Sequence, residues 1–358
     1  MLHSPDAPHV QDGTIPPLAP GAKGRNELFA HIVADDGTEG LGWYAGIASA
    51  RSVIEENLKD LLIGQDPFNT EKLWDDMFWR VRGYGRKGVA FQAIAILDIA
   101  LWDLKAKSLG LPLYRLLGQF ADSVPVYATA GWTNYTQDEV LDSFKYFMDR
   151  GFSRFKMKVG KDFGKSERED LARVEAVRRL VGDDAELYVD ANWAYTVKQS
   201  IRMSRQFEQF DIGFFEEPII ADDIDGMRAI RQATIIPVAS GELEYTKYGF
   251  KDLIARGGVD IPQPDIGRVG GITEWLKVAH LAHAFNLEIT THSLPILHAH
   301  VGMATPNLKL VEYGRVEHTY DFWFKEAPKP ENGRLKPFDR PGHGLELDPD
   351  VVAKYSVD

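Results

Sequence analysis

The chain has no cysteine among its 358 residues. This absence excludes disulfides and thiolate metal sites, so a bound metal ion would need oxygen or imidazole ligands. No apolar run approaches the roughly 20 residues that cross a bilayer. Residues 1–24 also lack the basic and then apolar stretches of a secretory signal. These absences predict a soluble cytoplasmic protein that does not associate with membranes.

The chain has fewer basic than acidic residues. It contains 41 Lys and Arg and 53 Asp and Glu, which gives a formal net charge of −12. An acidic surface argues against nucleic acid and anionic membranes as partners. An anionic small-molecule substrate would therefore have to be held by a metal ion or by local lysines. The length exceeds that of a usual single domain and allows two with an ample core.

Hydrophobic patterning divides the chain into four parts. Residues 1–25 are rich in Pro, Gly and Ala and predict an extended, mobile segment. Residues 26–120 predict an α+β domain, with strands around the Asp35-Asp36-Gly37 turn followed by helices, most clearly over 89–107. Residues 316–358 hold further turn signals and are expected to return to the N-terminal domain.

Residues 121–315 alternate short apolar strands with helices in eight similar units. Such alternation implies parallel strands with right-handed crossovers. The repetition favours closure into a (β/α)8 TIM barrel, and an open doubly wound sheet is the competing architecture. The predicted fold class is thus α/β, a barrel with an α+β N-terminal domain.

Seven ionisable residues occur singly at or near the C-terminal ends of these strand segments. In a (β/α)8 barrel those ends form the active-site face, and different strands contribute different catalytic groups. The seven would therefore meet in one site. In chain order they are Lys158, Asp190, Glu216, Glu242, Asp265, His292 and Glu312.

Three carboxylates, Asp190, Glu216 and Glu242, belong to consecutive units. They would repel each other strongly unless a cation lay between them. Hard oxygen ligands suit Mg²⁺, with Mn²⁺ as an alternative. A single carboxylate after a strand is often a helix N-cap, but three in succession favour a metal site. Glu217 and Glu244 are neighbours that could replace two of the ligands.

Lys156 and Lys158 are two residues apart, so their side chains share one face of a strand. If both point into the barrel, each makes it costlier to charge the other. That would lower a lysine pKa and provide a general base. The alternative is a solvated lysine pair on an edge strand, which a closed barrel lacks.

Asp265 and His292 end adjacent strands, where a carboxylate could fix the imidazole tautomer and raise its basicity. His298 and His300 are predicted to be structural. Glu312 lies on the last strand, next to the first strand in a closed barrel. It could be a carboxylic acid kept protonated to donate a hydrogen bond to an oxyanion, or an exposed carboxylate at a strand end.

Taken together, these segments resemble the enolase superfamily in its mandelate racemase subgroup. The resemblance covers roughly residues 27–350 and includes the helix text LDIALWDLKAKSLGLPLYRLLG. As a set the motifs are specific, although each alone is weak. They are Lys156-Met-Lys158, Val-Asp190-Ala-Asn192, Glu216-Glu217-Pro218, Gly241-Glu242, Pro264-Asp265, Thr291-His292-Ser293 and Glu312-Tyr313.

The resemblance implies the modified barrel and capping domain of that superfamily and removal of the proton alpha to a carboxylate with Mg²⁺. It implies Asp190, Glu216 and Glu242 as metal ligands. It also implies Lys158 as one base, and His292 with Asp265 as the other on the opposite face. The implied substrate contacts are Lys156, Glu312, Asn192 and Thr129. Homo-oligomers with an even number of subunits are common among relatives.

Within the family, this pair of bases most often dehydrates an aldonic or aldaric acid to a 2-keto-3-deoxy acid. A racemase or epimerase of a 2-hydroxy acid would use the same bases and is the alternative. The chain departs from the family at its start, where no long strand or covering loop is recognisable. Trp43 and Tyr44 would supply part of the cover, or else be buried aromatics of the N-terminal domain.

The segment Gly83-Tyr-Gly85-Arg-Lys-Gly88 has the spacing of a dinucleotide-binding loop. That fingerprint needs a strand before it and an acidic residue ending a second strand. Here the residues before the segment, LWDDMFWRVR, have a helical pattern, and Asp98 and Asp103 lie inside a predicted helix. An NAD-dependent oxidoreductase is therefore a remote alternative, as is a non-catalytic binding protein.

Overall fold

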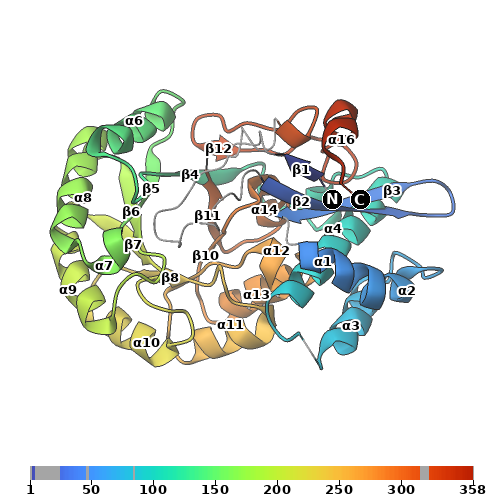
Figure 1. The fold of residues 1–358 in the computed structure, drawn as a ribbon, viewed down its shortest axis with the longest axis horizontal. Helices are drawn as coiled ribbons and strands as arrows, with labels where there is room; N and C mark the ends of the chain where they lie inside the picture. Colours follow the sequence, from blue (N-terminus) through green and yellow to red (C-terminus); the bar gives the residue numbers. More distant parts are fainter. Residues whose placement is uncertain (1, 5–24, 46–47, 84, 315–321, 358) are drawn as a thin grey trace.

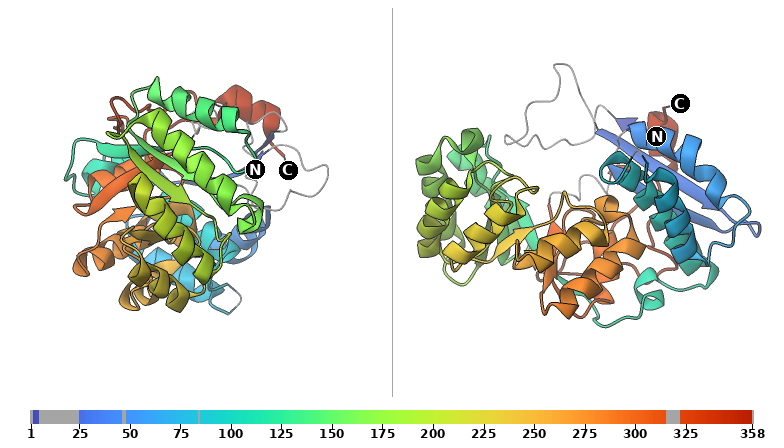
Figure 2. Two further views of the ribbon diagram at one scale, coloured as in Figure 1. Left: turned by 90° about the vertical axis from the view of Figure 1, so that its left-hand side faces the viewer. Right: turned by 90° about the horizontal axis from the view of Figure 1, so that it is seen from below.

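The structure is a computed structural model that describes residues 2–4, 25–45, 48–83, 85–314 and 322–357. It has an N-terminal domain with an antiparallel sheet, and a barrel of parallel strands surrounded by helices (Figure 1). Figure 2 shows the N-terminal sheet at one end of the molecule and helices α6 to α10 at the other. No helix in the described ranges is long and apolar enough to cross a membrane.

The N-terminal sheet has the order β1-β2-β3, with both pairs antiparallel. The strands are β1 (Leu2–Ser4), β2 (Arg25–Val33) and β3 (Glu39–Ala45). One or two strands were expected around the Asp-Asp-Gly turn, and two are present. Gly37 has the positive φ of 83° that this turn requires. The short strand β1 was not expected, and residues 5–24 lie outside the described part.

Helices cover one face of this sheet, and α4 is the central one. They are α1 (Ala48–Val53), the π-helical turn η1 (Ile54–Leu58), α2 (Lys59–Leu62), α3 (Thr70–Val81) and α4 (Val89–Ser108). A Cβ on Gly42 would lie 1.9 Å from the Ile96 carbonyl oxygen. Glycine there lets β3 lie directly against α4.

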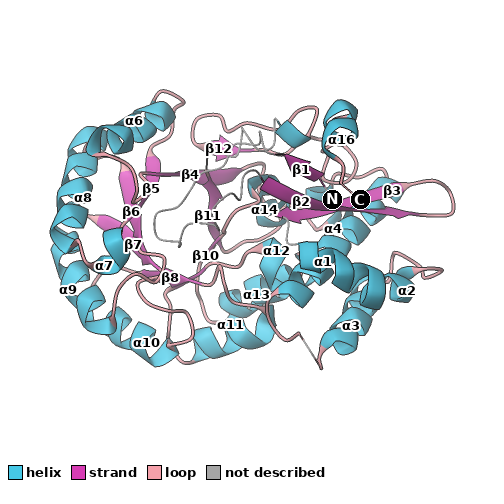
Figure 3. Ribbon diagram, in the orientation of Figure 1, coloured by secondary structure: helices cyan, strands magenta, loops and turns pink. Residues whose placement is uncertain are grey.

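The barrel contains eight parallel strands, as predicted. The hydrogen-bonded path runs β10-β11-β4-β5-β6-β7-β8-β9, so the sheet is closed except between β9 and β10. Figure 3 shows the helices outside this ring of strands. The strands are β4 (Val124–Ala130), β5 (Arg154–Lys158), β6 (Glu186–Asp190), β7 (Ile212–Glu216), β8 (Val238–Ser240), β9 (Ile261–Pro262), β10 (Ile289–Thr290) and β11 (Leu308–Tyr313).

Helices follow the barrel strands, as the alternating pattern predicted. The long ones are α6 (Gln137–Met148), α8 (Glu167–Val181), α9 (Val197–Phe207), α10 (Ile224–Ala233), α11 (Thr246–Ala255), α13 (Ile272–Ala284) and α14 (Pro295–Met303). Four shorter elements are α5 (Leu113–Leu116), α7 (Lys161–Gly164), α12 (Ile266–Val269) and the 3₁₀ turn η2 (Glu208–Phe210). Capping boxes at Thr136 and Thr196 fix the starts of α6 and α9.

The C-terminal segment returns across the molecule. Strand β12 (Arg334–Leu335) pairs with β4, and helix α16 (Pro349–Tyr355) lies near β1. The ring of Phe324 packs 5.1 Å from that of Trp43, and His343 lies within hydrogen-bond distance of the Leu41 carbonyl. The four domain limits inferred from the sequence stay a prediction.

Candidate active site

The seven ionisable residues lie at one end of the barrel. Three of them are the last residues of their strands, Glu312 is the last but one of β11, and the other three follow β8, β9 and β10 within three residues. Their side chains are buried or nearly so. Alternation of strands and helices brings them together because parallel strands present their carboxyl ends on the same side.

Three carboxylates form the centre of this site. Asp190, Glu216 and Glu242 each offer an oxygen, and the three oxygens lie within 4.8 Å of one another. Oε2 of Glu242 and Oε1 of Glu217 are buried, and neither makes a hydrogen bond to the described residues. Glu244 instead pairs with Lys87 at 2.8 Å, so it is not a member of this cluster.

Lys156 lies beneath the cluster and contacts three carboxylates. Its Nζ is 2.6 Å from Glu216, 3.0 Å from Glu312 and 3.2 Å from Asp190. Burial disfavours its charge, but Glu216 and Glu312 outweigh that cost and raise the pKa of Lys156. The expectation that paired lysines depress each other's pKa is therefore wrong for Lys156, because the carboxylates outnumber the lysines.

Lys158 approaches the cluster from one side. Its Nζ lies 2.5 Å from Oδ2 of Asp190 and 2.6 Å from Oδ1 of Asn192. Burial raises the pKa of Asp190, but the two lysines prevail and lower it to about 2. Burial and the Asp190 charge instead raise the pKa of Glu216 to about 8. The site thus holds more negative charge than its lysines neutralise.

His292 approaches the cluster from another side. Its Nδ1 is 2.6 Å from Oδ2 of Asp265, and its Nε2 is 3.5 Å from Glu242. The carboxylate holds the proton on Nδ1, which leaves Nε2 facing the cluster. Burial opposes protonation, but Glu242 and Asp265 outweigh it and raise the pKa of His292. The other oxygen of Asp265 caps α12 by accepting from the Gly267 N–H at 2.7 Å.

Glu312 does not act as the protonated hydrogen-bond donor that was one expectation. Its carboxylate accepts from the Thr129 hydroxyl at 2.6 Å and from the Ser293 N–H at 2.8 Å. Burial would raise the pKa of Glu312, but Lys156 and His292 together outweigh it and lower the pKa. Glu312 is therefore a charged acceptor that is held in place by its neighbours.

Two polar contacts at the site were not predicted. Tyr44, which was expected either to cover the site or to be a buried aromatic, donates its hydroxyl to Asp265 Oδ2 at 2.9 Å. Gln263, which was not named, donates to Glu216 Oε2 at 2.8 Å. Gln263 directly precedes the Pro264-Asp265 motif, and this position could have identified it as a candidate site residue. Nothing local to Tyr44 indicates its contact. Its neighbour Trp43 is a buried aromatic of the N-terminal domain, which was the simpler of the two expectations.

The expectation that His298 and His300 are structural is confirmed. Nε2 of His298 accepts from the Ile266 N–H, and Nδ1 lies 2.8 Å from the Ser293 carbonyl. Burial lowers the pKa of His298 to about 4 and that of His300 to about 3. Both imidazoles are therefore neutral packing groups.

The glycine-rich segment at residues 83–88 comes between α3 and α4 in the chain, so the described element before it is a helix and not a strand. The later acids Asp98 and Asp103 are buried within α4, as expected. The context that a dinucleotide-binding fingerprint requires is thus missing at this segment.

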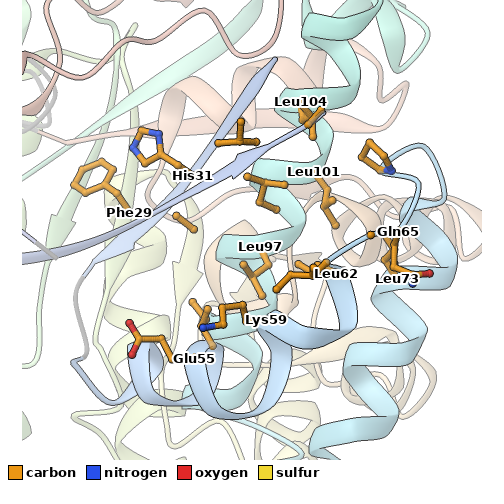
Figure 4. Close-up of a pocket in the computed structure, with 18 of the residues that line it drawn as sticks. Phe29, His31, Glu55, Lys59, Leu62, Gln65, Leu73, Leu97, Leu101 and Leu104 are labelled. Carbon is orange, nitrogen blue, oxygen red and sulfur yellow. The ribbon is translucent and has the colours of Figure 1, made fainter. Parts of the chain in front are cut away.

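A separate cavity of about 1120 Å³ lies in the N-terminal domain (Figure 4). Its lining includes Phe29 and His31 from β2 and Leu97, Leu101 and Leu104 from α4. In the described residues, β1 pairs only with residues 25–27, so the rest of that edge of β2 has no strand partner. None of the predicted site residues lines this cavity.

A (β/α)8 barrel with a carboxylate cluster and flanking acid–base groups defines a class of metal-assisted enzymes. The sequence matches two family models that place it within that class. The model of the mandelate racemase / muconate lactonizing enzyme N-terminal domain matches residues 21–118, and the enolase C-terminal domain-like model matches residues 139–351. The chain belongs to the mandelate racemase and muconate lactonizing enzyme family of the enolase superfamily.

Dehydratases and cycloisomerases are among the proteins that this chain resembles. It is 34% identical to an arabinonate dehydratase of Saccharolobus solfataricus over 92% of this chain and 90% of that protein. It is 36% identical to a 3,6-anhydro-alpha-L-galactonate cycloisomerase of Streptomyces coelicolor over 92% and 91%. A solved L-talarate dehydratase from Polaromonas, complexed with Mg and L-glucarate, is 36% identical with a TM-score of 0.87, covering 94% of this chain and 93% of that one.

Proposed function

We propose that this protein is a Mg²⁺-dependent acid-sugar dehydratase that converts an aldonic or aldaric acid to a 2-keto-3-deoxy acid. The observation that carries the proposal is the carboxylate cluster with Lys158 at Asp190 and His292 at Glu242. The dehydratases among its relatives support the same reaction. The proposed substrate is a small carboxylate, and nucleic acid is not an expected partner.

The residues at the cluster fit a hard divalent cation. Asp190, Glu216 and Glu242 would hold Mg²⁺, and Mn²⁺ suits the same oxygen donors. The buried Oε2 of Glu242 has no hydrogen-bond partner among the described residues, as expected for a metal-ligand atom. When bound, the metal would supply positive charge that stabilises the negative charge developing on the substrate carboxylate.

The remaining groups divide the proton transfers between them. In our proposal Lys158 removes the proton alpha to the substrate carboxylate. His292 gives the proton on Nε2 to the departing beta hydroxyl, which leaves as water, and the resulting enol becomes the 2-keto acid. Asp265 keeps the other imidazole nitrogen occupied, so that Nε2 is the atom that exchanges a proton.

Four further side chains complete the proposed site. Lys156 supplies a buried positive charge for the substrate carboxylate. Oε1 of Glu312 lies 3.0 Å from Nζ of Lys156. Asn192 accepts from Lys158, and Thr129 donates to Glu312, so both are placed beside groups that would touch the substrate. A homo-oligomer with an even number of subunits is part of the proposal, and light scattering would measure it.

A second candidate is isomerisation, either racemisation or epimerisation of a 2-hydroxy acid or a cycloisomerase reaction. The specific observation in its favour is that the similar proteins include cycloisomerases and a solved structure of a racemase. In racemisation or epimerisation, one base would remove the alpha proton and the other would return a proton from the opposite face. The same two groups serve both reactions, so the product decides between them.

The test is incubation with a panel of aldonic and aldaric acids in MgCl₂, scored for 2-keto acid with semicarbazide. Proton NMR in D₂O follows the alpha carbon in parallel. We expect keto acid from at least one substrate, loss of turnover in Lys158→Met and His292→Asn, and full turnover in Lys309→Met. Lys309 is a matched control because it pairs with Glu288 elsewhere on the barrel. Deuterium at the alpha carbon without keto acid would establish isomerisation instead.

A further inference from the structure

Tyr44 joins the N-terminal domain to the proposed acid–base pair. It lies on β3, and its side chain is 5% exposed. Its hydroxyl donates to Oδ2 of Asp265 at 2.9 Å, and this is the oxygen that lies 2.6 Å from Nδ1 of His292. One carboxylate oxygen therefore holds both a catalytic imidazole and a hydroxyl from the other domain.

The first turn of α12 is shaped to receive the Tyr44 ring. A Cβ on Gly267 would lie 2.0 Å from Cδ2 of Tyr44 and 2.1 Å from Cε2. The φ of Gly267 is not in the left-handed region, so its backbone does not require glycine. Glycine is needed there because the ring of Tyr44 occupies the space that a side chain would take.

Arg268 lies near the same carboxylate. Its Nε lies 3.7 Å from Oδ2 of Asp265, which is too long for a hydrogen bond. Its guanidinium bonds instead to the carbonyl oxygen of Glu242 at 3.1 Å and to the Glu242 carboxylate at 3.3 Å. The two close contacts to Oδ2 of Asp265 are therefore those of the Tyr44 hydroxyl and of His292 Nδ1.

We propose that Tyr44 is a positioning residue for His292, acting through Asp265, so that the N-terminal domain helps to orient a catalytic group of the barrel. The kinetic part of this proposal rests on the proposed function, in which His292 transfers a proton. The structural part concerns the orientation of the imidazole and does not depend on the identity of the substrate.

The test uses the full-length protein in MgCl₂ and compares Tyr44→Phe with Tyr114→Phe. Tyr114 is a matched control because its ring is also buried and its hydroxyl donates to the Asp339 carboxylate at 2.9 Å, outside the site. Two quantities are measured, kcat with KM, and the downfield N–H proton resonance of the imidazole. His292→Asn assigns that resonance by removing it.

We expect Tyr44→Phe to lower kcat by about 10-fold or more, as is typical when a partner that orients a catalytic ligand is removed. KM should change by less than about threefold, and the His292 resonance should shift. Tyr114→Phe should change neither. An unshifted resonance in Tyr44→Phe would overturn the proposal, and so would a kcat equal to that of Tyr114→Phe. If no acid sugar is turned over, the proposed function has failed, while the resonance still decides whether Tyr44 orients His292.

Gly267→Ala gives an independent check that keeps the hydroxyl. The added methyl group should displace the Tyr44 ring and lower kcat to a similar extent. In a Tyr44→Ala background the same substitution should have no further effect, because the ring it would clash with is gone. A full additional loss in that background would show that Gly267 serves some other contact and would count against the proposal.

Discussion

Replacing Lys156 by methionine should make the protein less stable and, at the same time, make its stability depend more on Mg²⁺. Lys156 is 1% exposed and contacts three carboxylates between 2.6 and 3.2 Å. Methionine fills a similar volume but leaves those carboxylates without their shared cation. The remaining negative charge would then be neutralised mainly by Lys158 and by any bound metal.

The size of the effect follows from the burial of these groups. Removing one partner of a buried ion pair costs about 3–5 kcal/mol. At roughly 2–4 °C per kcal/mol, the melting temperature without metal should fall by about 6–20 °C. Two unit charges about 4 Å apart interact by about 4 kcal/mol at an effective dielectric constant of 20. Removing the positive charge of Lys156 at about that distance from the cluster should therefore tighten Mg²⁺ binding at least tenfold. A tenfold gain adds about 1.4 kcal/mol, or roughly 3–6 °C, to the stabilisation by saturating Mg²⁺.

The assay is thermal unfolding in EDTA and across a series of MgCl₂ concentrations, with calorimetry for the affinity. Lys247→Met is the control, because Lys247 lies 3.1 Å from the buried carboxylate of Glu274, a residue outside the cluster. It should lower the melting temperature but leave the Mg²⁺ increment as in the wild type. An increment in Lys156→Met equal to or below the wild-type value would refute the reasoning that Lys156 and the metal share one set of carboxylates.

Three further outcomes are expected. Asp265→Asn should lower kcat about 100-fold, because an amide donor placed at Oδ2 would face Nδ1 of His292. A steady-state assay on the substrate identified by the panel would measure the loss. Acid should destabilise the fold through His298 and His300, whose folded pKa values of about 4 and about 3 lie below the usual value near 6.5 because of burial. Their neutral forms stabilise the protein fully above pH 6.5, and about 2 kcal/mol for each is lost as the pH falls toward 4, which urea unfolding at pH 7 and 4.5 would detect. Gly42→Ala should cost about 3 kcal/mol or more in urea unfolding, because its Cβ would meet the Ile96 carbonyl oxygen at 1.9 Å; an unchanged midpoint would mean that β3 can move away from α4.

The alternation of apolar strands and helices was enough to predict the barrel, because the period of the pattern changes visibly between the two kinds of element. It also predicted that Asp190, Glu216 and Glu242 would come together. Parallel strands connected by helices place their carboxyl ends on one side of the barrel. The topology therefore determines where a residue at the end of a strand lies. The 4.8 Å cluster follows from that rule.

The charge states of the site could not be read in the same way. The sequence led us to expect a lowered lysine pKa and left open whether Glu312 is protonated or a strand-end carboxylate. The pKa of Lys156 is instead raised, and that of Glu312 is lowered. A pKa depends on every charge within a few ångströms, and the sequence does not tell how many carboxylates surround each lysine.

The sequence alone determined the order of the site residues and the end of the barrel at which they meet, since both follow from local periodicity and chain direction. The tertiary structure alone decided which of these residues touch one another. Tyr44 and Asp265 are 221 positions apart and belong to different domains, and their hydrogen bond exists because Gly267 leaves room for the tyrosine ring. Such a contact depends on the packing of one surface against another, and no local pattern of residues specifies it.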